Sequence, residues 1–263
     1  MAKVAIVTGS ATGLGAACAV DLAGRGWNVA INYTKSKKEA DETYEKVKAK
    51  GVEAILVQAD MGQDADCKKL ATETMRKWSR IDGLINNAGT TKFQNQGDLD
   101  GVTAEDFDRI LRVNVTGPYM MSRAVFPVMK KQWDEKKERG SIVNISSIAG
   151  VMGVGTSIPY AASKGALNTL TLSLARWFGP AVRVNTVCPG FIQTRWLLGA
   201  LGKDDYEKLK ANQEQTTPLR QAGTAEQMAE AAIFFLTSAS NITGEFLIVD
   251  AGTHLGGLPM KGR

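Results

Sequence analysis

Two side chains that could move a proton stand one helical turn apart near the middle of the chain. Tyr160 and Lys164 are four residues apart in Pro159-Tyr-Ala-Ala-Ser-Lys164. If this segment is a helix, both side chains lie on one face, and the positive charge of Lys164 favours the ionised form of the Tyr160 phenol. Because a free tyrosine has a pKa of about 10, this help matters near neutral pH. The alternative is a packing tyrosine followed by a solvated lysine.

A serine upstream could assist the pair. Ser147 precedes Tyr160 by thirteen residues and adjoins Ser146 in Asn144-Ile-Ser-Ser-Ile148. Because side chains alternate along a strand, the two serines point to opposite faces, and only one can enter a common site. A hydroxyl placed there could hydrogen-bond an oxygen atom on which negative charge develops.

Glycines near the start of the chain predict an anion-binding loop. The strand-like run Val4 to Thr8 leads into Gly9, Gly13 and Gly15 and then into an apparent helix. Glycines let the backbone approach a pyrophosphate, and the helix N-terminus offers unpaired amides and a positive dipole end. We therefore expect dinucleotide binding. The loop residues expected at the cofactor are Gly9, Ser10, Thr12, Gly13, Leu14 and Gly15.

The stretch after the second expected strand bears on the choice of cofactor. An acidic residue about 20 positions after the loop would bind the ribose hydroxyls of NAD, but no acid stands between Ile31 and Glu39. This absence favours NADP(H) over NAD(H). Lys35, Ser36 or Lys37 could meet the extra phosphate, or the lysines could simply solvate a helix start. The residues expected at the cofactor here are Asn32, Tyr33, Thr34 and Lys35.

Strand-like and helical patterns alternate along most of the 263 residues. This alternation predicts an α/β fold, a single Rossmann-like, doubly wound, seven-stranded parallel sheet with helices on both faces, formed by one domain over residues 1–263. A helix is expected at 107–131, and the least regular region, 190–217, is expected to be a substrate lid. The strands are expected at residues 4–8, 28–33, 53–58, 83–86, 141–146, 182–187 and 246–249.

Composition limits the functional classes. The 32 basic and 27 acidic residues give a formal charge of +5, spread without an arginine-rich arm, so we expect anionic small molecules rather than nucleic acid. No apolar run approaches a membrane span, and a strand-like run directly after residue 3 leaves no room for a signal segment. Three separated cysteines and one histidine predict a reduced, cytoplasmic protein without a metal site.

Six motifs in order make the chain similar to the short-chain dehydrogenase/reductase family of the classical type, over nearly its whole length. We read 3-oxoacyl-carrier-protein reductases and sugar or alcohol dehydrogenases as the nearest subgroups. The thirteen-residue separation from Tyr160, which the family shares, selects Ser147 over Ser146. The motifs are Thr8-Gly-Ser-Ala-Thr-Gly-Leu-Gly15, Asn86-Asn-Ala-Gly89, Asn114, Ser147, Tyr160-x-x-x-Lys164 and Pro189-Gly190.

The resemblance implies four catalytic residues. Tyr160 would be the general acid or base, and Lys164 would lower its pKa and hold the nicotinamide ribose. Ser147 would hydrogen-bond the substrate oxygen. Asn114 would keep a water that links the lysine to solvent, unless it merely caps or bends its helix.

The resemblance also implies cofactor contacts beyond the phosphate loop. Asp60, with Met61 beside it, would contact adenine, although Asp60 could equally be a turn residue at a strand end. The segment 189–194 would hold the nicotinamide. The residues expected to line the cofactor site here are Asn86, Asn87, Ala88, Gly89, Pro189, Gly190, Ile192 and Thr194.

Substrate and assembly remain open from sequence. The apolar residues of the lid predict a medium-sized, partly apolar carbonyl or alcohol, with reduction of a 3-oxoacyl or similar ketone preferred. The alternatives are a sugar or polyol dehydrogenase and a non-catalytic regulator that senses NADP(H). The resemblance implies a homotetramer, paired through the helices that carry Asn114 and Tyr160 and through the last strand. The segment 250–263 is expected either to reach a neighbour or to fray, and His254 to be structural.

Overall fold

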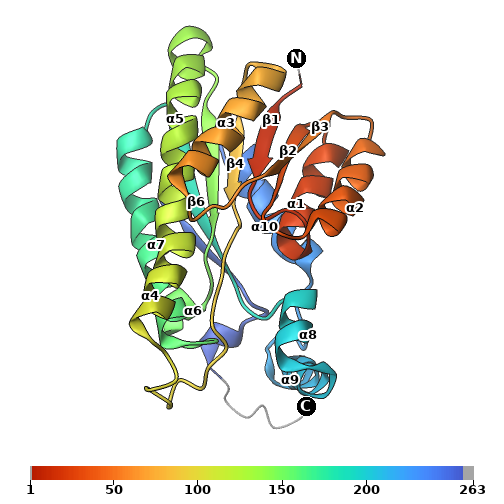
Figure 1. The fold of residues 1–263 in the computed structure, drawn as a ribbon, viewed down its shortest axis with the longest axis vertical. Coiled ribbons are helices and arrows are strands. Elements are labelled where there is room, and N and C mark those ends of the chain that lie inside the picture. Colours follow the sequence, from red (N-terminus) through yellow and green to blue (C-terminus); the bar gives the residue numbers. More distant parts are fainter. Residues whose placement is uncertain (1, 257–263) are drawn as a thin grey trace.

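Seven parallel strands form one continuous sheet in the computed structural model, which describes residues 2–256. The order is β3-β2-β1-β4-β5-β6-β7, and every neighbouring pair is parallel. The expected doubly wound sheet is confirmed (Figure 1). The strands are β1 (Val4–Val7), β2 (Asn28–Tyr33), β3 (Ala54–Gln58), β4 (Gly83–Asn86), β5 (Gly140–Ile145), β6 (Val182–Pro189) and β7 (Phe246–Val249).

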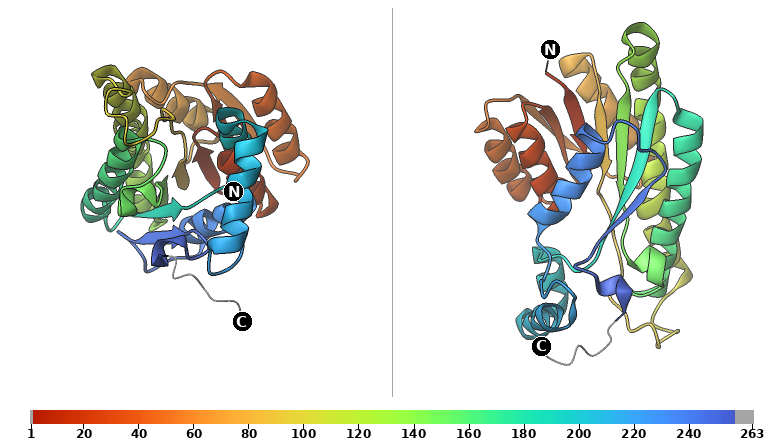
Figure 2. Two further views of the ribbon diagram at one scale, coloured as in Figure 1. Left: turned by 90° about the horizontal axis from the view of Figure 1, so that it is seen from below. Right: turned by 180° about the vertical axis from the view of Figure 1, so that it is seen from behind.

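Helices cover both faces of this sheet (Figures 1 and 2). On one face α1, α2 and α10 pack against the strands through residues such as Leu22, Val47 and Phe235, and on the other α3, α5 and α7 pack through residues such as Leu70 and Met121. The strands are therefore buried on both sides, as their apolar runs require. The helices are α1 (Gly13–Gly24), α2 (Lys37–Lys48), α3 (Asp64–Trp78), α4 (Ala104–Leu111), α5 (Gly117–Lys136), α6 (Ala149–Met152), α7 (Ile158–Phe178), α8 (Arg195–Leu201), α9 (Lys203–Thr216) and α10 (Ala225–Thr237).

The expected helix at 107–131 is divided. α4 passes into a π-helical turn, Arg112–Thr116, before α5 begins. Wide turns of this kind are rare and often occur at functional sites, and this one contains Asn114. The spacing of apolar residues does not reveal one extra residue in a helical turn, so the sequence predicts a single continuous helix here.

The region 190–217 is more regular than expected. It contains α8 and α9, which lie beyond the carboxyl ends of the strands at the lower end of Figure 1. The Thr194 side chain caps α8 by accepting from the amide of Leu197, and Gly202, with φ of 76°, separates the two helices. The expectation of an irregular segment was therefore wrong. Neither helix has a buried residue, so neither shows a clear apolar period in the sequence.

The three cysteines are free and buried. Burial raises the pKa of the Cys67 thiol to about 12 and that of Cys188 to about 11, so the thiols stay protonated and unreactive. Among the helices of residues 2–256, none is both long and apolar enough to cross a bilayer. Within those residues no cluster of three metal-ligating side chains occurs either.

A close approach of two backbones sets the position of α7. A Cβ atom on Gly150 would lie 2.4 Å from the carbonyl carbon of Lys164 and 2.6 Å from the nitrogen of Gly165. Only glycine lets α6, directly after β5, approach α7 this closely. The contact brings the segment around Ser147 alongside the helix that carries Tyr160 and Lys164.

We predict that Gly150→Ala destabilises the fold by about 3 kcal/mol, because backbone atoms cannot yield as a flexible side chain does. Urea unfolding of this variant measures the loss. Gly24→Ala is the matched control, since a Cβ there meets no atom within 4 Å; it should keep or slightly raise stability. Equal stability of the two variants would contradict the close contact.

Candidate active site

A cavity of about 610 Å³ opens at the carboxyl ends of β1, β4, β5 and β6. In doubly wound sheets ligands bind at this edge, where the strand order reverses; here the reversal lies between β1 and β4. Most of the expected site residues border the cavity. They are Gly9, Thr12, Gly13, Leu14, Thr34, Lys35, Asp60, Met61, Asn87, Ala88, Gly89, Ser147, Tyr160, Lys164, Pro189, Gly190, Ile192 and Thr194.

Six residues expected at the site do not line this cavity: Ser10, Gly15, Asn32, Tyr33, Asn86 and Asn114. Ser10 and Asn32 are buried and shape the loop from behind. The Ser10 hydroxyl donates to the Val7 carbonyl at 2.6 Å, while the Asn32 side chain accepts from the Gly9 amide at 2.9 Å. Their polar atoms therefore serve the loop conformation instead of a ligand.

The other members of this group also have structural roles. Tyr33 packs against Ala11 and Ala40. A Cβ on Gly15 would lie 2.5 Å from the Asn87 side-chain nitrogen, so α1 needs glycine there for close packing. Asn86 is buried and donates to the side-chain oxygen of Asn144 at 2.9 Å, which leaves Asn87 as the amide at the cavity.

The phosphate loop has the geometry that an anion requires. Gly9 and Gly13 have φ of 59° and 57°, in the left-handed region that glycine adopts at no steric cost. Thr12, the residue before α1, makes no side-chain capping bond to the first turn. The amides of that turn therefore remain available at the positive end of the helix dipole, and the loop fits a pyrophosphate.

Of the basic residues after β2, only one borders the cavity. Lys35 and Thr34 line it, whereas Lys37 does not and instead pairs with Asp41 at 2.7 Å. Asp60 borders the cavity and also accepts from the Gly62 amide at 2.8 Å. Asp60 therefore lies at the cavity and also stabilises the turn that follows β3.

Ser147, Tyr160 and Lys164 converge on the cavity from β5 and α7. The Ser147 hydroxyl lies close enough to the Tyr160 phenol to influence its pKa, and it accepts from the Ala149 amide at 3.1 Å. Ser146 also borders the cavity, but its hydroxyl donates to the Lys164 carbonyl at 3.1 Å. Ser147 is thus the serine whose hydroxyl meets the phenol.

The Lys164 ammonium is buried and held in place. Its Nζ donates to the Ile145 carbonyl at 2.8 Å and lies 5.6 Å from the centroid of the Tyr160 ring. Burial lowers the pKa of Lys164 to about 8, because a charge loses hydration there. The lysine therefore carries its charge at neutral pH and loses it far more readily than a free lysine.

The expected lowering of the Tyr160 pKa was wrong for this geometry. Burial raises the pKa of the phenol above its ordinary value, and the hydrogen bond with Ser147 opposes this only in part. Lys164 is not among the causes of this shift. Tyr160 is consequently protonated at neutral pH and poised to donate.

Asn114 clamps the chain beside the cavity. Its side-chain oxygen accepts from the Thr90 amide at 2.8 Å, and its nitrogen donates to the Thr90 carbonyl at 2.9 Å and to the Ser163 hydroxyl at 2.9 Å. The π-helical turn aims the amide at this strand-like segment. Every side-chain polar atom of Asn114 is used, so the side chain joins the nucleotide side of the site to α7.

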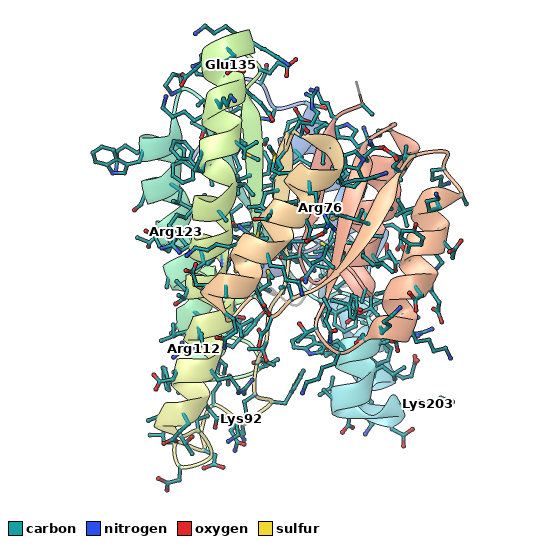
Figure 3. The ribbon with its side chains drawn as sticks, turned by 45° about the horizontal axis from the view of Figure 1, so that its top comes forward. Arg76, Lys92, Arg112, Arg123, Glu135 and Lys203 are labelled. Carbon is teal, nitrogen blue, oxygen red and sulfur yellow. The ribbon has the colours of Figure 1, made fainter. Side chains whose placement is uncertain are left out.

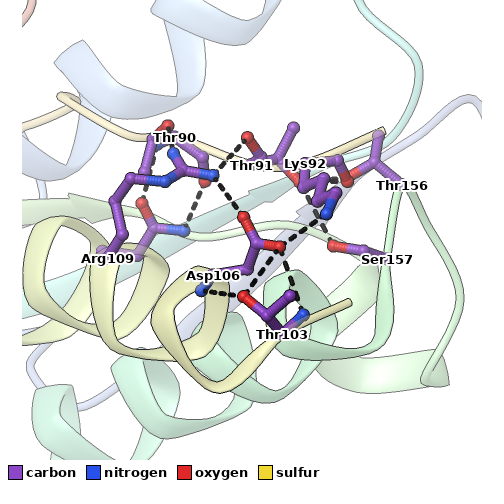
Figure 4. A network of polar contacts seen from close by, with 9 residues as sticks. Thr90, Thr91, Lys92, Thr103, Asp106, Arg109, Thr156 and Ser157 are labelled. Carbon is purple, nitrogen blue, oxygen red and sulfur yellow. Dashed lines mark hydrogen bonds and ion pairs between the residues drawn. The ribbon is translucent and has the colours of Figure 1, made fainter. Parts of the chain in front are cut away.

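A polar network at the mouth was not expected from the sequence (Figure 4). Arg109 lines the cavity and donates to the Thr90 hydroxyl at 2.8 Å, while Lys92 pairs with Asp106 at 2.6 Å. Thr103 and Asp106 form a capping box at the start of α4. The Thr-x-x-Asp spacing is the feature of the sequence that could have predicted this helix start. Further cavity residues, beyond those expected from the sequence, are Thr90, Val113, Ile145, Ser146, Arg195, Trp196 and Leu197.

His254 lies outside this cavity, as expected for a structural residue. Its Nδ1 is 2.9 Å from Asp250. The remainder of the tail, 257–263, lies outside the described residues.

Comparison with known proteins decides the family. A family model described as Enoyl-(Acyl carrier protein) reductase matches residues 9–254. The chain belongs to the short-chain dehydrogenase/reductase family. It is therefore an oxidoreductase that acts on ketones or alcohols, in a family that uses a nicotinamide cofactor.

Three similar proteins illustrate this membership. A ketoacyl reductase of the granaticin polyketide synthase of Streptomyces violaceoruber is 39% identical over 254 residues, covering 97% of each chain. The 3-oxoacyl-acyl-carrier-protein reductase of Staphylococcus epidermidis is 33% identical over 257 residues, 97% of this chain and 100% of that protein. A solved short-chain dehydrogenase/reductase from Burkholderia xenovorans has a TM-score of 0.90 and 36% identity, covering 97% and 99% of the two chains.

The pKa of Lys164 leads to a prediction about pH. Because burial brings this pKa down to about 8, the ammonium is lost as pH rises through that value, and with it the charged group expected to hold the nicotinamide ribose. We expect kcat/KM for ketone reduction to be flat below about pH 7 and to fall above pH 8, measured with NADPH at saturating concentration. Circular dichroism across the range controls for unfolding. Activity that stays constant to pH 10 would contradict the assignment.

Proposed function

We propose that this protein is an NADP(H)-dependent ketone reductase that acts on a 3-oxoacyl compound or a similar ketone. The observation that carries the proposal is the meeting of Ser147, Tyr160 and Lys164 at one cavity with the phosphate loop. A ketone bound there would have both hydroxyls within reach of its oxygen. The ketoacyl and 3-oxoacyl reductases among the similar proteins support the substrate class.

The proton step follows from the protonation of Tyr160. Since burial raises the pKa of the phenol, the group carries the proton that the carbonyl oxygen needs. The Ser147 hydroxyl stabilises the negative charge that develops on the same oxygen. The bound nicotinamide supplies the hydride. The Lys164 ammonium would hold the nicotinamide ribose, and solvent returns a proton to the phenolate that remains.

The raised pKa also bears on direction. Oxidation of an alcohol requires the phenolate as base, whereas reduction requires the neutral phenol. At neutral pH the neutral phenol dominates in this geometry. The neutral phenol can donate to a ketone in reduction, and oxidation of a sugar or polyol is the second candidate.

The preference for NADP(H) rests on charge. An acid is absent from 31–38, and Lys35 stands at the cavity rim next to Thr34, both exposed. A lysine there can pair with a phosphate on the adenosine ribose as a mobile point charge. Lys37 is held by Asp41 and contributes less.

The homotetramer remains a proposal, supported by exposed apolar side chains. Tyr119 on α5, Leu172 on α7 and Leu247 on β7 are each more than a third exposed. These elements include the helices and the last strand through which the assembly is expected to pair.

We predict that Tyr160→Phe lowers kcat for ketone reduction about 10²- to 10⁴-fold, because it removes the proton donor and nothing else. The dissociation constant for NADPH, followed by fluorescence, should change little. Tyr119→Phe is the matched control, an exposed tyrosine outside the cavity, and should keep full turnover. Undiminished turnover of Tyr160→Phe would overturn the mechanism.

A second prediction concerns the cofactor. Lys35→Ala should raise the dissociation constant for NADPH about tenfold and leave that for NADH unchanged, since only NADPH carries the extra phosphate. Lys37→Ala, outside the cavity, is the control and should have a much smaller effect. Wild-type affinities that are equal for the two cofactors, or higher for NADH, would defeat the preference.

A further inference from the structure

Two aromatic rings from distant parts of the chain meet at the mouth of the cavity. Phe93, in the segment after β4, and Trp196, in the first turn of α8, have ring centroids 5.2 Å apart and planes inclined by 57°. Trp196 lines the same cavity as Ser147 and Tyr160. Phe93 does not itself line the cavity; it packs against Trp196 from the opposite side of the entrance.

The Phe93 side of this bridge is fixed to the body of the protein. Lys92, its neighbour, pairs with Asp106. The backbone N–H of Gln94 donates to the Thr156 carbonyl at 2.9 Å. Thr91 shares a 2.6 Å hydrogen bond with Thr156, only four residues before Tyr160. Figure 4 shows Lys92 paired with Asp106 and Thr91 bonded to Thr156.

The Trp196 side has little holding it. No residue of α8 is buried, and the helix ends at Gly202. Gln193 anchors its start through two 2.9 Å hydrogen bonds, to the carbonyls of Gly223 and Ala222. In Figure 3, Lys92 lies on the α4 side of the entrance and Lys203, the first residue of α9, on the opposite side. One ring is thus rigid and the other is carried on an exposed helix.

The exposed surface of α8 points to what the rings contact. Trp196 is 49% exposed even with Phe93 against it, and Leu197 lines the cavity beside it. The tilted contact with Phe93 therefore leaves part of the Trp196 ring free. Aromatic faces favour flat, apolar partners in offset or edge-on contact, and a small movement of α8 would widen the wedge between them.

We propose that Phe93 and Trp196 form an aromatic clamp that selects ketones whose carbonyl lies on, or next to, a flat ring. The inference rests on the proposed reductase function and names its substrate class. The rings hold the body of the substrate at the entrance, while Ser147 and Tyr160 hold its oxygen deeper in the cavity. The clamp does not touch the reacting carbonyl, so it acts on binding of the substrate more than on the chemical step.

Steady-state reduction of 2-tetralone, a fused-ring ketone, is compared with that of ethyl acetoacetate, an open-chain ketone, using NADPH. The wild-type protein should prefer 2-tetralone in kcat/KM. Trp196→Ala should raise KM for 2-tetralone about tenfold, change its kcat little, and alter kcat/KM for ethyl acetoacetate by less than about threefold. Trp196→Phe keeps an aromatic face and should recover most of the loss.

Leu198→Ala is the matched control, because Leu198 is on the same helix, is 38% exposed and does not line the cavity. It should keep the preference for 2-tetralone, which separates loss of the ring from general disturbance of α8. Quenching of tryptophan fluorescence by 2-tetralone, present in the wild type and reduced in Trp196→Phe, gives a readout apart from turnover.

Two results would overturn the clamp while leaving the reductase intact: a wild-type protein that reduces both ketones without preferring 2-tetralone, or an equal loss for both ketones in Trp196→Ala. A wild-type protein that reduces neither ketone with NADPH or NADH would instead contradict the proposed function, and the clamp would fall with it.

Discussion

Burial of one ammonium group is the constraint on which the site depends. Lys164 is only 4% exposed, and its Nζ meets the Ile145 carbonyl at the end of β5. A lone charge is costly in such a place, and the pKa near 8 is the measure of that cost. The contact also ties α7 to the central sheet, because a shift of the helix would leave the buried ammonium without its hydrogen-bond acceptor. The position of Tyr160 follows, since it lies one turn earlier on the same helix.

Several separate elements serve this one placement. Gly150 lets α6 approach the backbone of α7. Ser146 also holds α7, because its hydroxyl donates to the Lys164 carbonyl. Asn114 joins α7 to the segment after β4. These contacts come from the segments that follow β4 and β5 and from the π-helical turn before α5. Catalysis by positioned groups requires such rigidity, because a small displacement of a proton donor strongly lowers the reaction rate. By contrast, α8 and α9, in the segment expected to be a lid, bury none of their residues, which would suit a part that admits and releases ligands.

Much of this could be predicted from residue spacing, because spacing on a helix or strand is a local property. The seven strands, the glycine loop, and the shared face of Tyr160 and Lys164 all follow from it. Side-chain direction in loops could not be predicted in this way: Ser10 and Asn32 turn inward to bonds with partners far along the chain. The raised pKa of Tyr160 was missed because it depends on burial by the whole fold. Arg109 was missed because its partner Thr90 is nineteen residues away.

Transfer of hydrogen from labelled cofactor tests the assembled site most directly. A rigid pair of hydroxyls on one side of the cavity can present a carbonyl to only one face of the nicotinamide. With NADPH carrying deuterium at C4 in either of its two configurations, one form should place a single deuterium on the carbinol carbon of the product, detected by mass spectrometry, and the other none. Label transferred from both forms, or from neither during turnover, would contradict the geometry on which the function is built.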